Sequence, residues 1–129
     1  MSYVLDTHSL IWFLTSNNKI GKNALELLRK ADEGKEEIIV PTVVLAEILY
    51  ICEKKKVAIK FREILERIKD SSNYIIYDLN LEVILKLEEL DKIHELHDRI
   101  IIATAILSNS KIITKDEAIT ESGYAEIIW

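Results

Sequence analysis

The chain is poor in the residues that build linkers and disulfides. Its 129 residues include one Pro, three Gly, one Cys and no Gln. So few Pro and Gly leave little sequence for linkers or disorder, and we expect no second domain. The lone Cys52 cannot form an intramolecular disulfide, and its apolar neighbours predict a reduced, buried thiol, which favours a cytoplasmic protein.

Long apolar runs and excess positive charge are also missing. No uncharged apolar run approaches the ~18 residues of a membrane-spanning helix, and Asp6 interrupts the apolar start, which argues against a secretory signal. The net charge of -5 argues against a broad basic surface that binds nucleic acid by phosphate neutralisation alone. Acids that hold metal ions would reverse that charge locally, so a nucleic-acid substrate stays open.

The apolar residues that are present follow the spacing of alternating strands and helices. Apolar residues make up 49% of the chain, enough for a substantial core. Strands separated by one or two helices predict an α/β fold with a mainly parallel, five-stranded sheet. The predicted strands are 3–6, 37–40, 74–77, 111–114 and 125–129, and the predicted helices are 10–14, 20–31, 41–55, 57–70, 79–90, 97–107 and 117–121.

Four acidic residues, Asp6, Glu47, Asp98 and Asp116, stand in apolar surroundings. An ionised carboxylate buried without a partner costs several kcal/mol, so such positions call for a proton, a cationic partner or a metal. Three of the four adjoin the predicted carboxyl edge of the sheet, where parallel α/β folds bind their ligands. We therefore expect the four acids to lie at one site.

A structural role is the competing interpretation. Asp is a favoured helix N-cap, so Asp6, Asp98 and Asp116 could each simply cap a helix. Glu47 lies about two turns into its helix and is the only charged residue from Ile38 to Cys52, so capping does not account for it. A buried ion pair with Arg99 is the alternative for Glu47.

Carboxylate ligands without clustered Cys or His suit a hard cation, Mg²⁺ or Mn²⁺. Such a site can activate a water and stabilise the attacking and leaving oxygens during phosphodiester hydrolysis. The pattern leaves open whether one ion or two bind.

Four motifs carry a family resemblance: Asp6-Thr7-His8-Ser9-Leu10-Ile11-Trp12, Glu47 in its apolar helix, the segment from His97 to Ala105, and Ile113-Thr114-Lys115-Asp116. Together they resemble PIN domains, and most of all the VapC toxins of type II toxin–antitoxin modules. The resemblance spans nearly the whole chain and implies a single PIN domain over 1–129 with three α/β/α layers.

The same resemblance implies a Mg²⁺-dependent endoribonuclease, usually a homodimer, that a VapB antitoxin holds inactive. Asp6, Glu47, Asp98 and Asp116 would be the catalytic and metal-binding residues, with Asp6 and Asp98 as principal ligands. Thr7 and Thr114 would hydrogen-bond carboxylates and fix their rotamers.

Other functions are compatible with parts of the same pattern. A PIN-like scaffold for RNA binding or assembly, without cleavage, is the first alternative. A receiver-like phosphoacceptor domain fits poorly, because strand one supplies one acid and not a pair. The run Lys54 to Lys56 could track an RNA backbone or form a solvated face. Histidines could act as acid or base, and aromatic residues could form a dimer or antitoxin surface, although packing or surface roles explain both equally or better. These residues are His8, His94, His97, Trp12, Phe13 and Tyr50.

Overall fold

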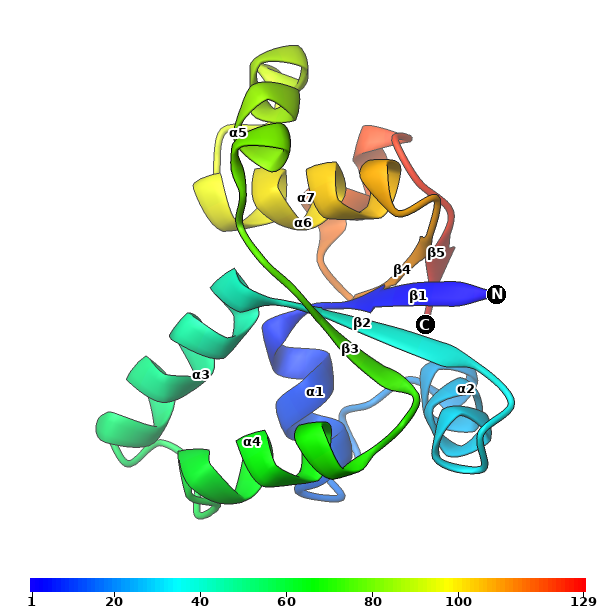
Figure 1. The fold of residues 1–129 in the computed structure, drawn as a ribbon, viewed down its shortest axis with the longest axis vertical. Helices are drawn as coiled ribbons and strands as arrows, with labels where there is room; N and C mark the ends of the chain where they lie inside the picture. The colour runs from blue at the N-terminus through cyan, green and yellow to red at the C-terminus, as the bar shows by residue number, and fades with distance from the viewer.

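The computed structural model describes residues 1–129 and contains one sheet of five strands, all parallel (Figure 1). Their order is β3-β2-β1-β4-β5. The strands are β1 (Ser2–Leu5), β2 (Glu37–Pro41), β3 (Tyr74–Tyr77), β4 (Lys111–Ile113) and β5 (Ile127–Ile128). The predicted α/β class and five-stranded sheet are confirmed, and the sheet is wholly parallel.

Helices cover the sheet on both sides (Figure 1). The helices α1 to α4 connect β1, β2 and β3 on one side, and α5 to α7 lie on the other. Successive strands are added on one side of β1 as far as β3, and β4 and β5 are then added on the other side of β1. Because crossovers between parallel strands are right-handed, the later helices lie on the opposite face of the sheet. Their bounds are α1 (Thr7–Leu14), α2 (Lys22–Asp32), α3 (Thr42–Glu53), α4 (Phe61–Asp70), α5 (Leu81–Leu87), α6 (Leu96–Leu107) and α7 (Glu117–Ser122), with a 3-10 turn, η1 (Glu88–Leu90).

The central strands are buried because helices pack on both faces. Val4 and Leu5 of β1, Ile38 and Val40 of β2 and Ile112 of β4 have no exposed surface. Parallel strands of this kind read as continuous apolar runs, since neither face meets water. The edge strand β3 is only half-buried. No helix in the structure has both the length and the apolar character to cross a membrane.

Three sequence predictions need correction. The strand predicted at 125–129 is confined to Ile127–Ile128. The helix predicted from residue 57 begins at Phe61, because Lys55 takes a left-handed conformation (φ 54°) that ends α3, and the next residues form an irregular turn. Cys52 is half-buried and not buried, and its thiol points to the carbonyl oxygen of Ile59 at 3.5 Å. Partial burial still raises the pKa of this thiol.

Candidate active site

The strand order reverses between β1 and β4, which are neighbours in the sheet although they are far apart in the chain. From β1 the connections lead one way to β2 and β3, and from β4 they lead the other way to β5. The crevice outside the carboxyl ends of such a strand pair is where open α/β sheets bind ligands. Asp6 follows β1 directly, and Asp116 lies three residues beyond β4.

Hydrogen bonds hold the Asp6 carboxylate at this crevice. Its Oδ1 accepts a bond of 3.0 Å from the backbone N–H of Ser9, so Asp6 is the N-cap of α1. Its Oδ2 accepts a short bond from the hydroxyl of Thr114. Thr114 is 1% exposed and therefore has few alternative positions. The carboxylate is fixed in orientation while each oxygen keeps a further lone pair for a ligand.

Thr114 also joins Asp6 to Asp116. The backbone N–H of Asp116 donates to the Thr114 hydroxyl oxygen at 3.0 Å, and the Asp116 Oδ1 accepts from the N–H of Ile119 at 2.9 Å, capping α7. Asp6 and Asp116 line one cavity of about 270 Å³. The capping role considered for these two acids is therefore present, and it leaves them room to bind a ligand as well.

Glu47 reaches the same edge from α3. Its Oε1 accepts a bond of 2.9 Å from the hydroxyl of Thr7, the first residue of α1. The expectation that Thr7 and Thr114 orient carboxylates is confirmed. Arg99 does not pair with Glu47, because its Nε donates to the carbonyl oxygen of Ile93 at 2.7 Å. The alternative of a buried Glu47–Arg99 ion pair is wrong.

Asp98 lies in the first turn of α6 but does not cap it. The N-cap is Glu95, whose Oε2 accepts from the N–H of Asp98 at 2.8 Å. The Asp98 carboxylate is thus left free of the capping role considered for it. Burial, followed by repulsion from Asp116, Glu95 and Asp6, raises the pKa of Asp98 to about 7. Asp98 therefore interacts electrostatically with Asp6, which follows β1, and with Asp116, which follows β4.

Glu95 and His97 complete the rim of the site. The His97 Nδ1 lies 2.7 Å from Glu95 Oε1, and this contact, aided by Glu47 and Asp98, raises the pKa of His97. Burial pushes the pKa of Glu95 upward, but hydrogen bonds from Asp98 and His97 outweigh it and the net direction is downward. A cationic imidazole is favoured where several carboxylates meet.

The family model for the PIN domain matches residues 3–122, almost the entire chain. The chain belongs to the PIN domain family. PIN domains are in general nucleases. No curated protein sequence matches the chain.

Solved structures share the fold of this PIN domain. VapBC2 from Rickettsia felis, bound to a DNA fragment from its promoter, superposes with a TM-score of 0.71 at 21% identity, covering 98% of this chain and 97% of that one. VapBC-1 from nontypeable Haemophilus influenzae gives 0.66 at 14% identity, with 98% and 96% covered. A toxin–antitoxin complex from Klebsiella pneumoniae gives 0.65 at 19% identity, with 95% and 94% covered. The three-layer PIN-like fold expected from the sequence is confirmed.

The four acids of this PIN domain lie at the carboxyl edge of the sheet but do not form a single cluster of metal ligands. No three His, Cys, Asp or Glu side chains are arranged to hold a metal ion together. Mg²⁺ is commonly held by one or two carboxylates, with waters and substrate phosphate filling its other positions. The pair Asp6 and Asp116, oriented by Thr114, meets that requirement. The pKa of Asp98 is raised first by burial and then by repulsion from neighbouring acids, and a cation would relieve that repulsion. The donor set therefore fits a hard divalent cation.

The sequence pattern did not single out Glu95 or Lys115 at the site. Glu95 is hard to find because Glu is not a favoured N-cap, although its place three residues before Asp98 is a weak signal. Lys115 lines the cavity of Asp6 and Asp116, and only the fold brings it beside Asp6.

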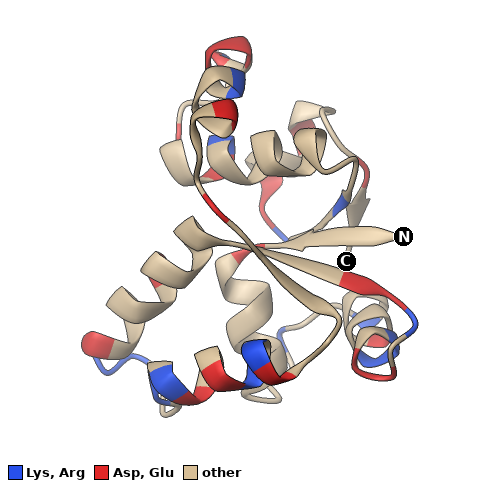
Figure 2. Ribbon diagram, in the orientation of Figure 1, with Lys and Arg blue, Asp and Glu red and all other residues tan.

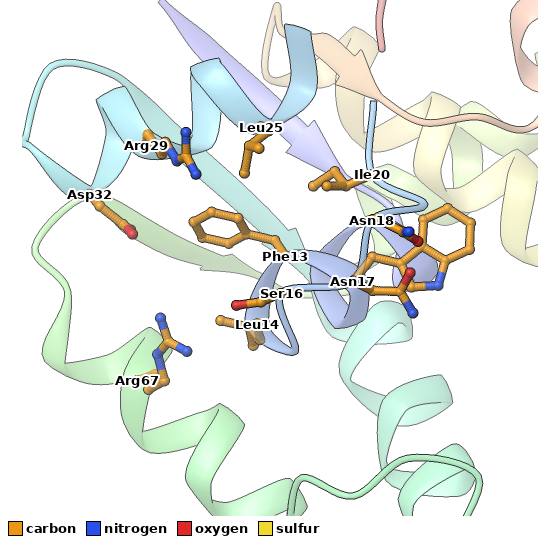
Figure 3. A pocket seen from close by; sticks show the side chains of 11 residues that line it. Phe13, Leu14, Ser16, Asn17, Asn18, Ile20, Leu25, Arg29, Asp32 and Arg67 are labelled. Atoms are coloured by element: carbon orange, nitrogen blue, oxygen red, sulfur yellow. The ribbon is translucent and has the colours of Figure 1, made fainter. Parts of the chain in front are cut away.

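Figure 3 shows a different cavity, of about 520 Å³, which contains none of the four acids. It lies among α1, α2 and α4, with Arg29, Asp32 and Arg67 around Phe13. The basic and acidic residues of α4 alternate (Figure 2), so that helix does not present one continuous positive face.

Proposed function

We propose that this PIN domain is a metal-dependent endoribonuclease that hydrolyses RNA phosphodiester bonds with Mg²⁺ or Mn²⁺. We further propose that it is the toxin of a type II toxin–antitoxin pair. The observation that supports the proposal is that Asp6 and Asp116 line one cavity at the strand-order reversal, while Asp98 interacts electrostatically with both and buried Thr114 and Thr7 orient Asp6 and Glu47.

Each acid has a separate task in this proposal. Asp6 and Asp98 would be the principal metal ligands, because Thr114 orients Asp6 and no capping bond occupies the Asp98 carboxylate. Asp116 and Glu47 would hold a bound water or a second ion. The metal, when bound, would activate water and stabilise the oxygens of the phosphate undergoing displacement.

A non-catalytic RNA-binding or assembly scaffold is the alternative function. A scaffold has no use for several carboxylates brought together at a cost in stability. The raised pKa of Asp98 is a direct sign of that cost. The observation therefore favours the nuclease.

The decisive experiment is cleavage of a labelled single-stranded RNA by the purified protein, with Mg²⁺, with Mn²⁺ and with a chelator. Asp6→Asn and Asp98→Asn should each lower cleavage at least 100-fold, as expected when a group that stabilises transition-state charge is lost. Asp91→Asn, at an exposed position outside the site, is the matched control and should cleave normally. Undiminished cleavage by either site variant would refute the mechanism.

The proposed partners are an RNA substrate, a VapB-like antitoxin and a second copy of the chain. The structural neighbours include complexes of toxin with antitoxin, which supports the antitoxin. Helix α5 leaves Leu81, Ile84 and Leu85 exposed, at 70%, 44% and 58%. Three large apolar side chains on one short helix are typical of a protein interface. We assign this face to the homodimer.

A further inference from the structure

The cavity beside Asp6 and Asp116 is also lined by aromatic and basic side chains, which are not ligands for a hard divalent cation. It lies between the segments that follow β1 and β4, at the strand-order reversal, and encloses about 270 Å³. Two acids occupy one part of its wall, and an indole, an imidazole, an ammonium group and a serine occupy the rest. Its lining residues are Asp6, His8, Ser9, Trp12, Lys115 and Asp116.

Trp12 is held in place from several sides. The His8 ring, one helical turn earlier on α1, lies 5.6 Å from the Trp12 ring between centroids. Trp129 at the chain end meets it edge-on at 5.9 Å, and the Lys19 ammonium lies 6.0 Å from its centroid. Trp12 is only half-buried, so the indole is a fixed wall that still faces the cavity.

No ion pair accounts for the position of Lys115 or His8. Both are exposed, and neither takes part in any of the ion pairs of the chain. Trp12 is the only apolar residue of the lining. A cavity with two carboxylates, an ammonium and one aromatic wall is unsuited to an apolar peptide side chain. It matches a flat polar heterocycle attached to a phosphate.

We propose that this cavity is a nucleobase subsite, which receives one unstacked base of single-stranded RNA next to the phosphate being cleaved. The base stacks on Trp12, His8 contacts its edge, and Lys115 contacts an adjoining phosphate. Stacking on an aromatic side chain accepts every base, so the subsite selects single-stranded RNA over duplex and not one sequence. This inference rests on the proposed nuclease function, because it places the scissile phosphate at Asp6 and Asp116.

The test measures binding without cleavage. A fluorescent 12-nucleotide single-stranded RNA is titrated with protein in chelator, and its anisotropy gives Kd. Trp12→Ala should weaken binding roughly 5- to 150-fold, the usual cost of losing one stacked base, whereas Trp12→Phe should keep most of the affinity. Lys115→Ala should lower the slope of log K against log salt by about 0.7, the value for one phosphate contact on a single strand.

Control variants outside the cavity separate a loss of base binding from a general loss of charge or of folding. His8→Ala should weaken binding, whereas Asp91→Asn, at an exposed position outside this cavity, should not. Lys69→Ala, on the exposed surface of α4, should leave the salt slope unchanged. Thermal melting checks each fold, and if Trp12→Ala is unfolded, the His8 and Lys115 variants decide. NMR signals of the Trp12 indole and His8 ring should also shift on addition of AMP.

Equal affinity of folded Trp12→Ala, His8→Ala and wild type for the RNA would overturn the subsite, as would control variants that lose as much affinity as the cavity variants. If wild type cleaves RNA with Mg²⁺ and Trp12→Ala cleaves with the same KM, the subsite fails while the nuclease stands. If binding depends on Trp12 but no metal supports cleavage, the nuclease fails and the base-binding cavity stands. Absence of binding by wild type refutes the subsite.

Discussion

Asp98→Asn is expected to inactivate the protein and at the same time to stabilise its metal-free form. Burial and the neighbouring acids raise the pKa of Asp98 from 3.8 to about 7. The folded state therefore favours the protonated carboxyl more strongly than the unfolded state does. The resulting stability is complete below pH 3.8 and is lost as the pH rises through 7. Above that pH the native fold carries an unfavourable charge that Asn would remove.

The size of the effect follows from the two pKa values. Their difference corresponds to roughly 4 kcal/mol for a fully buried group. Asp98 is half-buried, and screening by solvent reduces the gain in the free energy of unfolding to about 1–2 kcal/mol. For a chain of this length that gain raises Tm by about 3–8 °C.

The assay is thermal and urea unfolding at pH 8 and pH 4.5, in chelator and in Mg²⁺. Asp98→Asn should exceed wild type at pH 8 in chelator, and the advantage should shrink at pH 4.5. Mg²⁺ should stabilise wild type more than the variant, because a ligand that binds only the folded state adds stability. The control, Asp91→Asn, should show neither effect. A variant less stable than wild type at pH 8 would refute the account of Asp98.

The remaining predictions concern the threonine link, the dimer face and the turn after α3. Thr114→Val should lower Mg²⁺ affinity about 10- to 100-fold in a calorimetric titration, because Thr114 orients the Asp6 carboxylate. It should also lower the free energy of unfolding by about 1–3 kcal/mol, because Asp6 and the Asp116 N–H lose a buried partner. Unchanged Mg²⁺ affinity would contradict this role of Thr114. If the proposed dimer forms through this face, Leu85→Glu should yield a monomer in light scattering under conditions where wild type is a dimer, and a persistent dimer would exclude this face of α5. Lys55→Gly should raise stability by about 0.5 kcal/mol in urea unfolding, because Gly adopts φ 54° without steric cost, and a fall would show that the lysine side chain matters more.

Local pattern determined much of the fold. The strand at Tyr74–Tyr77 was predicted with its observed bounds, because a β-branched and aromatic run between polar segments has few other solutions. The errors fall where the chain leaves regular structure. The turn at Lys55 depends on how α3 and α4 pack, and β5 extends over Ile127–Ile128 alone because only these two residues pair with β4. Periodicity does not report either constraint.

The sequence by itself predicted which acids form the site and indicated that Glu47 is not a cap, since a charge inside an apolar helix is visible without coordinates. Only the tertiary structure showed which of these acids share a cavity and which of them cap a helix. Asp6 and Asp116 share a cavity through Thr114, whereas Asp98 leaves capping to Glu95. The physical reason is distance along the chain: β1 and β4 become neighbours only when the sheet forms, more than 100 residues apart in sequence. That pairing also brings Lys115 to Trp12, a juxtaposition that no local motif encodes.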